Sequence, residues 1–240
     1  MTALFISDLH LDPERPDITS QCLDFLDAEA GRAQSLYILG DLFESWIGDD
    51  DPDPEKRRVT ECLAKVSAGG TRLFFMHGNR DFLIGPDFSR RTGCVLLEDP
   101  TVVDLFGERV LLMHGDTLCT DDVAYQAFRA MVRDPAWQSA FLARSLEERA
   151  VLARSAREQS QAASAGKPAD IMDVNADAVA DAMRRHEVRL LLHGHTHRPA
   201  VHHFELDGRN ATRIVLGDWY EQGSVVRWDT GGYELITLPR

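Results

Sequence analysis

Side chains that could bind metal ions gather in five short clusters of this 240-residue chain. In chain order they are Asp8-Leu9-His10, Gly40-Asp41, His77-Gly78-Asn79-Arg80-Asp81, His114-Gly115-Asp116 and His193-Gly194-His195-Thr196-His197. Imidazole, carboxylate and amide oxygen, without thiolate, are ligands that suit borderline-hard divalent cations. A single cluster arises easily by chance. Five in order predict one shared site for divalent cations.

Each cluster follows a short apolar run that is typical of a buried β-strand. The five runs are Ala3–Ser7, Leu36–Leu39, Leu73–Met76, Val110–Met113 and Leu190–Leu192. Helical patterns near Ile18–Ala33 and Pro54–Ser67 separate the first three runs, and such alternation predicts an α/β sheet covered by helices. Because ligands in α/β folds bind beyond the carboxyl ends of the strands, we expect the five clusters to meet in space.

Two regions depart from this alternation. The segments Ala200–Leu206, Thr212–Leu216, Ser224–Asp229 and Tyr233–Leu238 have the pattern of short strands, and we expect a β meander that closes the fold. Residues 121–168 show no strand pattern, and Asp134-Pro135 fits a helix N-cap followed by proline at the first helical position. We therefore predict a helical lid at residues 121–168, inserted into a domain formed by residues 1–120 and 169–240.

The composition excludes several classes of protein. A net charge of −13 argues against nucleic-acid binding, because a phosphate backbone requires a basic surface. The four cysteines, Cys22, Cys62, Cys94 and Cys119, have no paired spacing and are expected to be reduced thiols. No stretch approaches the roughly 18–20 apolar residues of a membrane span, and no signal peptide is recognisable. We expect a cytoplasmic protein that is at most peripheral on a membrane, with no obligate protein partner.

The order D-x-H, G-D, G-N-x-D, H-G-D and G-H-T-H resembles the signature of the calcineurin-like metallophosphoesterases. The resemblance implies a β-sandwich flanked by helices, with two metal ions and a bridging water that attacks phosphorus. It implies that the first metal is held by Asp8, His10, Asp41 and His197. It implies that the second is held by Asp41, Asn79, His114 and His195. Manganese is the best candidate for both ions, and iron and zinc also fit these ligands.

Other polar residues of the clusters are expected to support the ligands. We expect Asp81 and Asp116 to orient ligating imidazoles through their free ring nitrogens. For His193 two interpretations stay open, this same supporting role and buried packing. We interpret His77 as structural and the histidines outside the clusters as surface residues.

Arg80 stands where many members of the family have histidine, in the pattern G-N-H-[DE]. A histidine can protonate a leaving alkoxide, whereas arginine stays charged and cannot act as an acid at neutral pH. Arginine can still donate two hydrogen bonds to phosphate oxygens and stabilise transition-state charge. This substitution favours a leaving group that needs no proton, such as the phosphate released from a pyrophosphate. A solvated arginine beside Asp81 is the alternative.

Longer stretches resemble one bacterial family, the UDP-2,3-diacylglucosamine diphosphatases, over essentially the whole chain. The stretches are 36–44, 46–50, 77–83, 113–121 and 192–200. The resemblance implies hydrolysis of UDP-2,3-diacylglucosamine at its α-phosphorus, which gives UMP and 2,3-diacylglucosamine 1-phosphate in lipid A biosynthesis. It implies catalytic roles for Asp41, Arg80 and His195. It implies substrate contacts by Asn79, Arg80, Asp122, Ser160, Ser164, Lys167 and His195. Relatives often carry a longer polar residue at the position of Ser164.

The predicted lid has two features that suit a lipid substrate. An apolar set of residues could line a groove for two acyl chains or could simply pack as core: Tyr125, Phe128, Met131, Val132, Trp137 and Phe141. Basic residues could draw the lid to the anionic cytoplasmic face of the inner membrane, or could pair with Glu147, Glu148 and Glu158: Arg129, Arg133, Arg144, Arg149, Arg154 and Arg157. Both pairs of interpretations stay open.

Two other functions fit parts of the pattern. Another nucleotide anhydride could be the substrate, because the metal ligands alone do not distinguish among anhydrides. A non-catalytic binding module of the same fold is the second alternative. Such a module would be expected to have lost ligands, and here every ligand position is filled.

Overall fold

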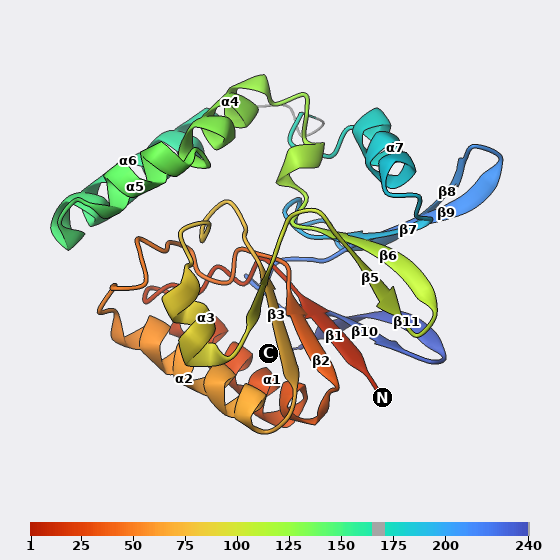
Figure 1. Cartoon of the computed structure of the whole chain (residues 1–240), viewed down its shortest axis with the longest axis horizontal. Helices are drawn as coiled ribbons and strands as arrows, with labels where there is room; N and C mark the ends of the chain where they lie inside the picture. The colour runs from red at the N-terminus through yellow and green to blue at the C-terminus, as the bar shows by residue number, and fades with distance from the viewer. Residues whose placement is uncertain (165–170, 240) are drawn as a thin grey trace.

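The computed structural model describes residues 1–164 and 171–239, and it confirms the predicted α/β sandwich (Figure 1). The first sheet has the strand order β11-β10-β1-β2-β3-β4, and the second has the order β5-β6-β7-β9-β8. In the first sheet the strands are β1 Ala3–Ile6, β2 Ser35–Ile38, β3 Arg72–Met76, β4 Val95–Leu97, β10 Gly223–Asp229 and β11 Gly232–Leu238. In the second they are β5 Thr101–Leu105, β6 Glu108–Met113, β7 Leu190–His193, β8 Ala200–Leu206 and β9 Arg209–Val215.

Three apolar clusters hold the layers together. Between the sheets, the Phe5 ring stacks on the Tyr37 ring with 4.7 Å between centroids, and the Tyr37 ring stacks on the Phe74 ring with 4.5 Å between centroids. The helices α1 Pro16–Ala28, α2 Pro54–Ala68 and α3 Pro86–Thr92 cover the outer face of the first sheet. The helix α7 Ala176–Arg185 packs on the second sheet through Val179 and Met183. Burial of β1 and β2 on both faces explains why their sequences are continuous apolar runs.

The expected C-terminal meander is wrong in its pairing, although its four strands are present. β8 pairs with β9 in the second sheet, whereas β10 pairs with β11 and with β1 in the first. The chain therefore crosses from one sheet to the other between Val215 and Gly223. Turn residues predict each hairpin, but they do not specify which sheet edge a hairpin joins. The elements α3, β4, β5 and α7 were not predicted at all.

Three helices form the segment that was predicted as a lid: α4 Val123–Val132, α5 Pro135–Leu142 and α6 Leu146–Ser164. They lie together, apart from the helices that cover the sheets (Figure 1). As expected, the Asp134 side chain caps α5, accepting from the backbone N–H of Ala136 and Trp137. The Asp122 side chain caps α4 in the same way through Tyr125 N–H.

Four arginines of these helices contact the domain beneath them. Arg129 pairs with Asp116 at 2.7 Å, and Arg133 donates to the Gly78 carbonyl at 2.9 Å. The buried Arg149 donates to the Ile47 carbonyl and pairs with Asp50. Arg157 pairs with Glu44. These four guanidinium groups are therefore engaged with the core domain, and these contacts are not the predicted pairs with lid glutamates. The predicted attraction to a membrane stays a prediction.

Candidate metal centre

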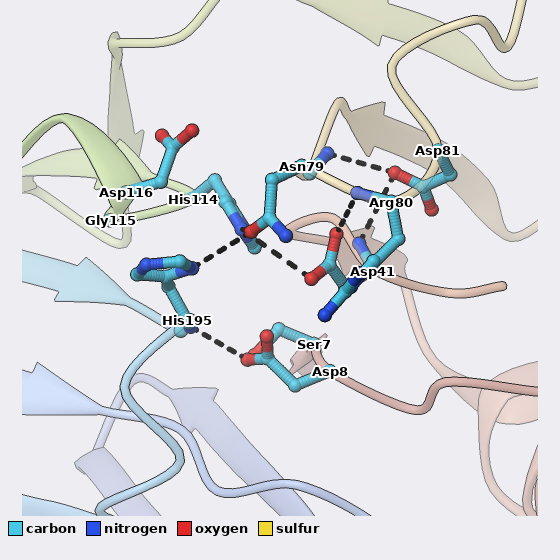
Figure 2. A network of polar contacts seen from close by, with 12 residues as sticks. Ser7, Asp8, Asp41, Asn79, Arg80, Asp81, His114, Gly115, Asp116 and His195 are labelled. Carbon is cyan, nitrogen blue, oxygen red and sulfur yellow. Dashed lines mark hydrogen bonds and ion pairs between the residues drawn. The ribbon is translucent and has the colours of Figure 1, made fainter. Parts of the chain in front are cut away.

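Backbone hydrogen bonds between loops bring the five clusters together. The Asp8 N–H donates to the Gly40 carbonyl at 3.1 Å, and the His10 N–H donates to the Asp41 carbonyl at 3.0 Å. Across the sandwich, the Gly194 N–H donates to the His114 carbonyl at 2.8 Å. Figure 2 shows the side chains from these loops pointing toward one another. The predicted convergence at the carboxyl ends of the strands is therefore found.

Several of the predicted ligands have a backbone conformation that is rare outside glycine. Positive φ angles occur at Asp8 (56°), His10 (51°), Asp41 (53°), His195 (69°) and His197 (56°). The left-handed region is costly for residues with a Cβ atom, and such residues persist where the surroundings fix them. Five such residues around one point indicate that the fold stores strain to aim these side chains.

Two glycines allow the loops to approach closely. A Cβ atom on Gly78 would lie 2.1 Å from Asp41 Oδ1, and one on Gly194 would lie 2.3 Å from Asp8 Oδ2. Any other residue at either position would displace a carboxylate of the site. The glycines in G-N-x-D and G-H-T-H are thus required by contact between loops.

The first group of ligand atoms lies around Asp8. Its Oδ2 accepts from Ser7 Oγ at 2.6 Å and from the His195 N–H at 2.8 Å. Its Oδ1 is buried without a hydrogen-bond partner, 3.5 Å from His197 Nε2. His197 Nε2 in turn lies 3.1 Å from His10 Nε2. Two imidazole nitrogens and a carboxylate oxygen therefore face one another, which suits a shared cation.

The second group is centred on Asn79, whose Oδ1 lies 2.9 Å from both His114 Nε2 and His195 Nδ1 (Figure 2). Asp41 joins the two groups, because its Oδ2 lies 3.8 Å from His10 Nε2 and 3.8 Å from His114 Nε2. Its other oxygen accepts from the Arg80 backbone N–H at 2.8 Å. The structure thus brings all seven predicted ligands together in two groups that share Asp41. That they ligate metal stays a prediction.

The ionisation of these groups also suits cations. Burial lowers the pKa of His10 to about 4 and the pKa of His195 to about 4, so both imidazoles are neutral near pH 7. Burial alone would raise the pKa of Asp8, but contact with His197 holds it well below its usual range. Burial opposes protonation of His114, yet Asp41 and Asp116 raise its pKa to about 9. A metal at this position would therefore displace a proton from His114 at pH 7.

The supporting contacts differ from those expected. Asp81 accepts from the backbone N–H groups of Gly78, Asp41 and Leu42, so it fixes loops and not an imidazole. Asp116 accepts from Tyr125 Oη and Arg129 Nε, both at 2.7 Å, and so ties α4 to the core. Sequence spacing could not reveal this, because the partners lie in loops and in the lid.

Other groups contact the outer nitrogens of the imidazoles. His114 Nδ1 lies 2.8 Å from the Leu39 carbonyl. His197 Nδ1 lies 3.4 Å from Asp218, and His10 Nδ1 lies 2.9 Å from Glu44. Glu44 and Asp218 were not predicted, because neither lies in a cluster with ligand spacing.

The remaining histidines of the clusters pack inside. His193 is buried, with Nδ1 2.8 Å from the Gly194 carbonyl and Nε2 3.2 Å from an Arg213 donor. Its role is therefore packing and loop support, and not contact with an imidazole of the site. His77 Nε2 lies 2.7 Å from the Ile84 carbonyl, consistent with the structural role predicted for it.

A cavity of about 860 Å³ extends from the site beneath the lid helices. The lid contributes the apolar side chains of Phe128, Val132, Trp137, Phe141 and Leu152 to its lining, together with the charged side chains of Arg144 and Arg154. At the end beside the predicted metal ligands, the lining includes Glu44, Asn79, Arg80, Arg157 and Ser160. Of the predicted lining residues, Met131 is instead half exposed on the lid surface. The cavity thus joins an apolar region to a charged end beside the predicted metal ligands.

The predicted substrate contacts fall in different places. Asn79, Arg80 and Ser160 line the cavity. Asp122 caps α4 through Tyr125 N–H. Lys167 and the side chain of Ser164 lie outside the described residues. The contacts of these residues with substrate stay predictions.

A buried carboxylate behind the site, Asp99, gives a prediction about stability. Burial and the charge of Asp116 raise the pKa of Asp99 to about 6. Because the folded pKa exceeds the unfolded value of about 3.9, this carboxylate destabilises the fold as pH rises through that window. Asp99→Asn is expected to stabilise metal-free protein at pH 8 by up to about 2–3 kcal/mol. The corresponding rise in Tm is about 4–12 °C.

The pH dependence of the Tm difference between Asp99→Asn and wild type distinguishes an effect of Asp99 ionisation from a general packing effect. The gain from Asp99→Asn should be small near pH 4, grow until about pH 6–7 and then stay constant. Thermal unfolding in the presence of a chelator measures it. An equal gain at pH 4 and pH 8 would contradict an ionisation effect.

Comparison with known proteins matches residues 1–199 to the family of calcineurin-like phosphoesterases. The chain is 54% identical over 247 residues to a UDP-2,3-diacylglucosamine hydrolase of Stenotrophomonas maltophilia, and all of both chains is covered. Enzymes of the same description from Pseudomonas paraeruginosa and Klebsiella pneumoniae are 54% and 52% identical over 239 residues, again with complete coverage. A solved archaeal phosphodiesterase has a similar fold, with a TM-score of 0.51 and 13% identity, covering 99% of this chain and 100% of that chain.

Proposed function

Because this chain belongs to the calcineurin-like phosphoesterase family, we propose that it hydrolyses the pyrophosphate bond of UDP-2,3-diacylglucosamine in lipid A biosynthesis. The products are UMP and 2,3-diacylglucosamine 1-phosphate. The observation that carries the proposal is a cavity that apolar side chains of the lid line together with Asn79 and Arg80 of the metal centre. A substrate with acyl chains at one end and a pyrophosphate at the other fits this division. The names of the full-length relatives supply the identity of that substrate.

The metal ions in this proposal are two manganese ions. Asp8, His10, Asp41 and His197 would hold one, and Asp41, Asn79, His114 and His195 the other. When bound, the pair supplies an activated water and neutralises phosphate charge. Support comes from the buried Asp8 Oδ1, which has no hydrogen-bond partner, and from the facing nitrogens of His10 and His197. Imidazole, carboxylate and amide oxygen, without thiolate, suit manganese.

The chain's own groups then position and stabilise the reacting phosphate. Arg80 lines the cavity at its charged end, where its guanidinium can stabilise negative charge on phosphate oxygens. The departing diacylglucosamine phosphate is a good leaving group and needs no proton from the enzyme. This matches arginine at the position where many relatives have histidine.

Residues 121–168 act in this proposal as a lid over the acyl chains. The apolar side chains of α4 and α5 that line the cavity exclude water from the chains, which contributes roughly 25 cal/mol per Å² of apolar surface buried. Phe128 is 42% exposed and borders the cavity, which favours the predicted groove for this residue. Phe141 belongs to the buried core and Trp137 packs against it, so these two also serve as core packing.

We also propose that the lid meets the cytoplasmic face of the inner membrane, where an acylated substrate resides. Among residues 1–164 and 171–239, no helix has the length and hydropathy to cross a bilayer. Val123, Met131 and Val151 are exposed apolar side chains on the lid helices. Co-sedimentation with anionic phospholipid vesicles should weaken when Met131→Glu is introduced. Equal binding of the variant would place the contact elsewhere.

A manganese-dependent assay that follows both products tests the proposed reaction. Purified protein should release UMP and 2,3-diacylglucosamine 1-phosphate from UDP-2,3-diacylglucosamine, and should leave dinucleoside polyphosphates intact. Hydrolysis of the latter at a similar rate would favour the alternative of another nucleotide anhydride. Fewer than one manganese ion bound per chain after loading would favour a non-catalytic binding module.

A further inference from the structure

One buried carboxylate, Glu44, contacts three groups around the metal centre. Its Oε2 lies 2.9 Å from His10 Nδ1, and its Oε1 lies 3.5 Å from Arg80 Nε. The same Oε1 pairs with Nη1 of Arg157, which lies on helix α6 of the lid. The Glu44 side chain is 5% exposed. One carboxylate therefore links a predicted metal ligand, the proposed phosphate-binding arginine and the lid.

The backbone around Glu44 is held in place. Its N–H donates to the Leu11 carbonyl at 3.1 Å, and the preceding residue Phe43 forms a β-bridge with Leu11. Leu11 follows His10 directly, so the loops that carry Glu44 and His10 are paired with each other. The carboxylate therefore has little freedom to move away from its three partners.

The partners of Glu44 distinguish it from an ordinary structural ion pair. Burial of a carboxylate is costly unless charged or hydrogen-bonding partners compensate it. Its partners all belong to the site or border the cavity. By contrast, Asp50 also pairs with an arginine of α6, Arg149, but the Asp50 side chain is 62% exposed and does not contact the metal centre.

We propose that Glu44 is a positioning residue that couples helix α6 of the lid to the metal centre, an inference that rests on the proposed function. It orients the His10 imidazole from the side opposite Nε2, and it holds Arg80 and Arg157 next to each other at the charged end of the cavity. Two guanidinium groups would otherwise repel each other there. Because Arg80 meets Glu44 through Nε, its terminal nitrogens remain for phosphate oxygens.

The variant Glu44→Gln tests the proposal, since it removes the charge and keeps the shape. At saturating manganese, kcat should fall about 10- to 100-fold, and manganese affinity of the metal-free protein should fall about tenfold, as for other residues that support metal ligands. Electron paramagnetic resonance of free Mn²⁺ measures the affinity without any substrate. Unchanged manganese affinity would overturn the role toward His10.

A double-mutant cycle separates positioning of Arg80 from general damage. In the Arg80→Ala background, Glu44→Gln should lower kcat by a clearly smaller factor than in the wild-type background, because one of the groups that it positions is gone. Equal losses in both backgrounds would overturn the proposed positioning of Arg80 by Glu44.

The variant Arg157→Gln tests the link between the lid and Glu44. It should raise KM and lower kcat while manganese affinity stays unchanged. A variant with the KM and kcat of the wild type would overturn the link to the lid.

Asp50→Asn is the matched control, because it removes the other carboxylate partner of α6. We expect kcat within about twofold of wild type and unchanged manganese affinity; a loss as large as that of Glu44→Gln would show that any lid contact has this effect and would overturn the proposal. Failure of the proposed function can be told apart from failure of the role of Glu44, because in the first case the wild-type protein itself would not release UMP. The manganese titrations would in that case still test the contact with His10.

Discussion

Asp41→Asn is expected to lower kcat by roughly 10³-fold or more, because it removes the charge that both ligand groups share. Asp41 Oδ2 lies 3.8 Å from an imidazole nitrogen of each group, His10 Nε2 and His114 Nε2. Asparagine has nearly the same shape, so packing beside Gly78 is preserved while the anion is lost. The loss should therefore appear as weaker binding of two manganese ions together with the loss of turnover, and not as unfolding.

Turnover and bound manganese per chain, measured on the same preparation, check this expectation. Asp104→Asn is a matched control, because Asp104 caps a turn of the β5–β6 hairpin through the Gly107 N–H, far along the sheet from the site. It should leave turnover and manganese content at wild-type values. Residual activity of more than a few per cent in Asp41→Asn would mean that Asp41 does not bridge the metals.

Arg80→Ala is expected to lower kcat by roughly 10²–10³-fold with manganese retained, as for loss of one transition-state donor. The contact between Arg80 and Asp41 explains why the metal centre should survive. It is the Arg80 backbone N–H that donates to Asp41 Oδ1, and alanine keeps this donor. The variant removes the side chain beyond Cβ, which includes the guanidinium at the charged end of the cavity and its contact with Glu44.

Arg80→Lys provides the control for charge. Lysine keeps the positive charge but lacks the planar pair of donors, so it should recover part of the lost turnover and remain below wild type. Steady-state kinetics with the diacylated UDP-sugar, alongside manganese analysis, measures both variants. Wild-type turnover in Arg80→Ala with two manganese ions bound would refute the assigned role and support the solvated-arginine alternative.

The sequence by itself determined the five strands that lead into the site and the residues that meet at their ends. Strands β1, β2, β3, β6 and β7 lie where apolar runs predicted them, because burial on both faces demands continuous apolar sequence. The polar clusters follow these strands directly, so their convergence needed no knowledge of side-chain contacts. The cap of α5 was likewise readable, since Asp134 and Pro135 act on the residues next to them.

Only the tertiary structure decided what supports the predicted ligands. Glu44 contacts His10, Arg80 and Arg157, which are separated from it along the chain by up to 113 positions and lie in different elements. Asp116, expected to serve an imidazole, instead anchors α4 through Tyr125 and Arg129. Periodicity and spacing report local conformation and burial, whereas these contacts depend on how distant loops are placed.

The remaining differences between prediction and structure have the same cause, because they too depend on how distant segments are placed. The hairpins β8–β9 and β10–β11 join different sheets although their sequences predict one meander, because hairpin patterns do not encode the strand edge that they meet. The positive φ angles of Asp8, His10 and Asp41 also have no reliable local signal. Aspartate and histidine adopt that conformation more often than other residues with a Cβ atom, but still in a small minority of cases. Packing of the two sheets imposes it, and this strain aims the carboxylates and imidazoles at one point.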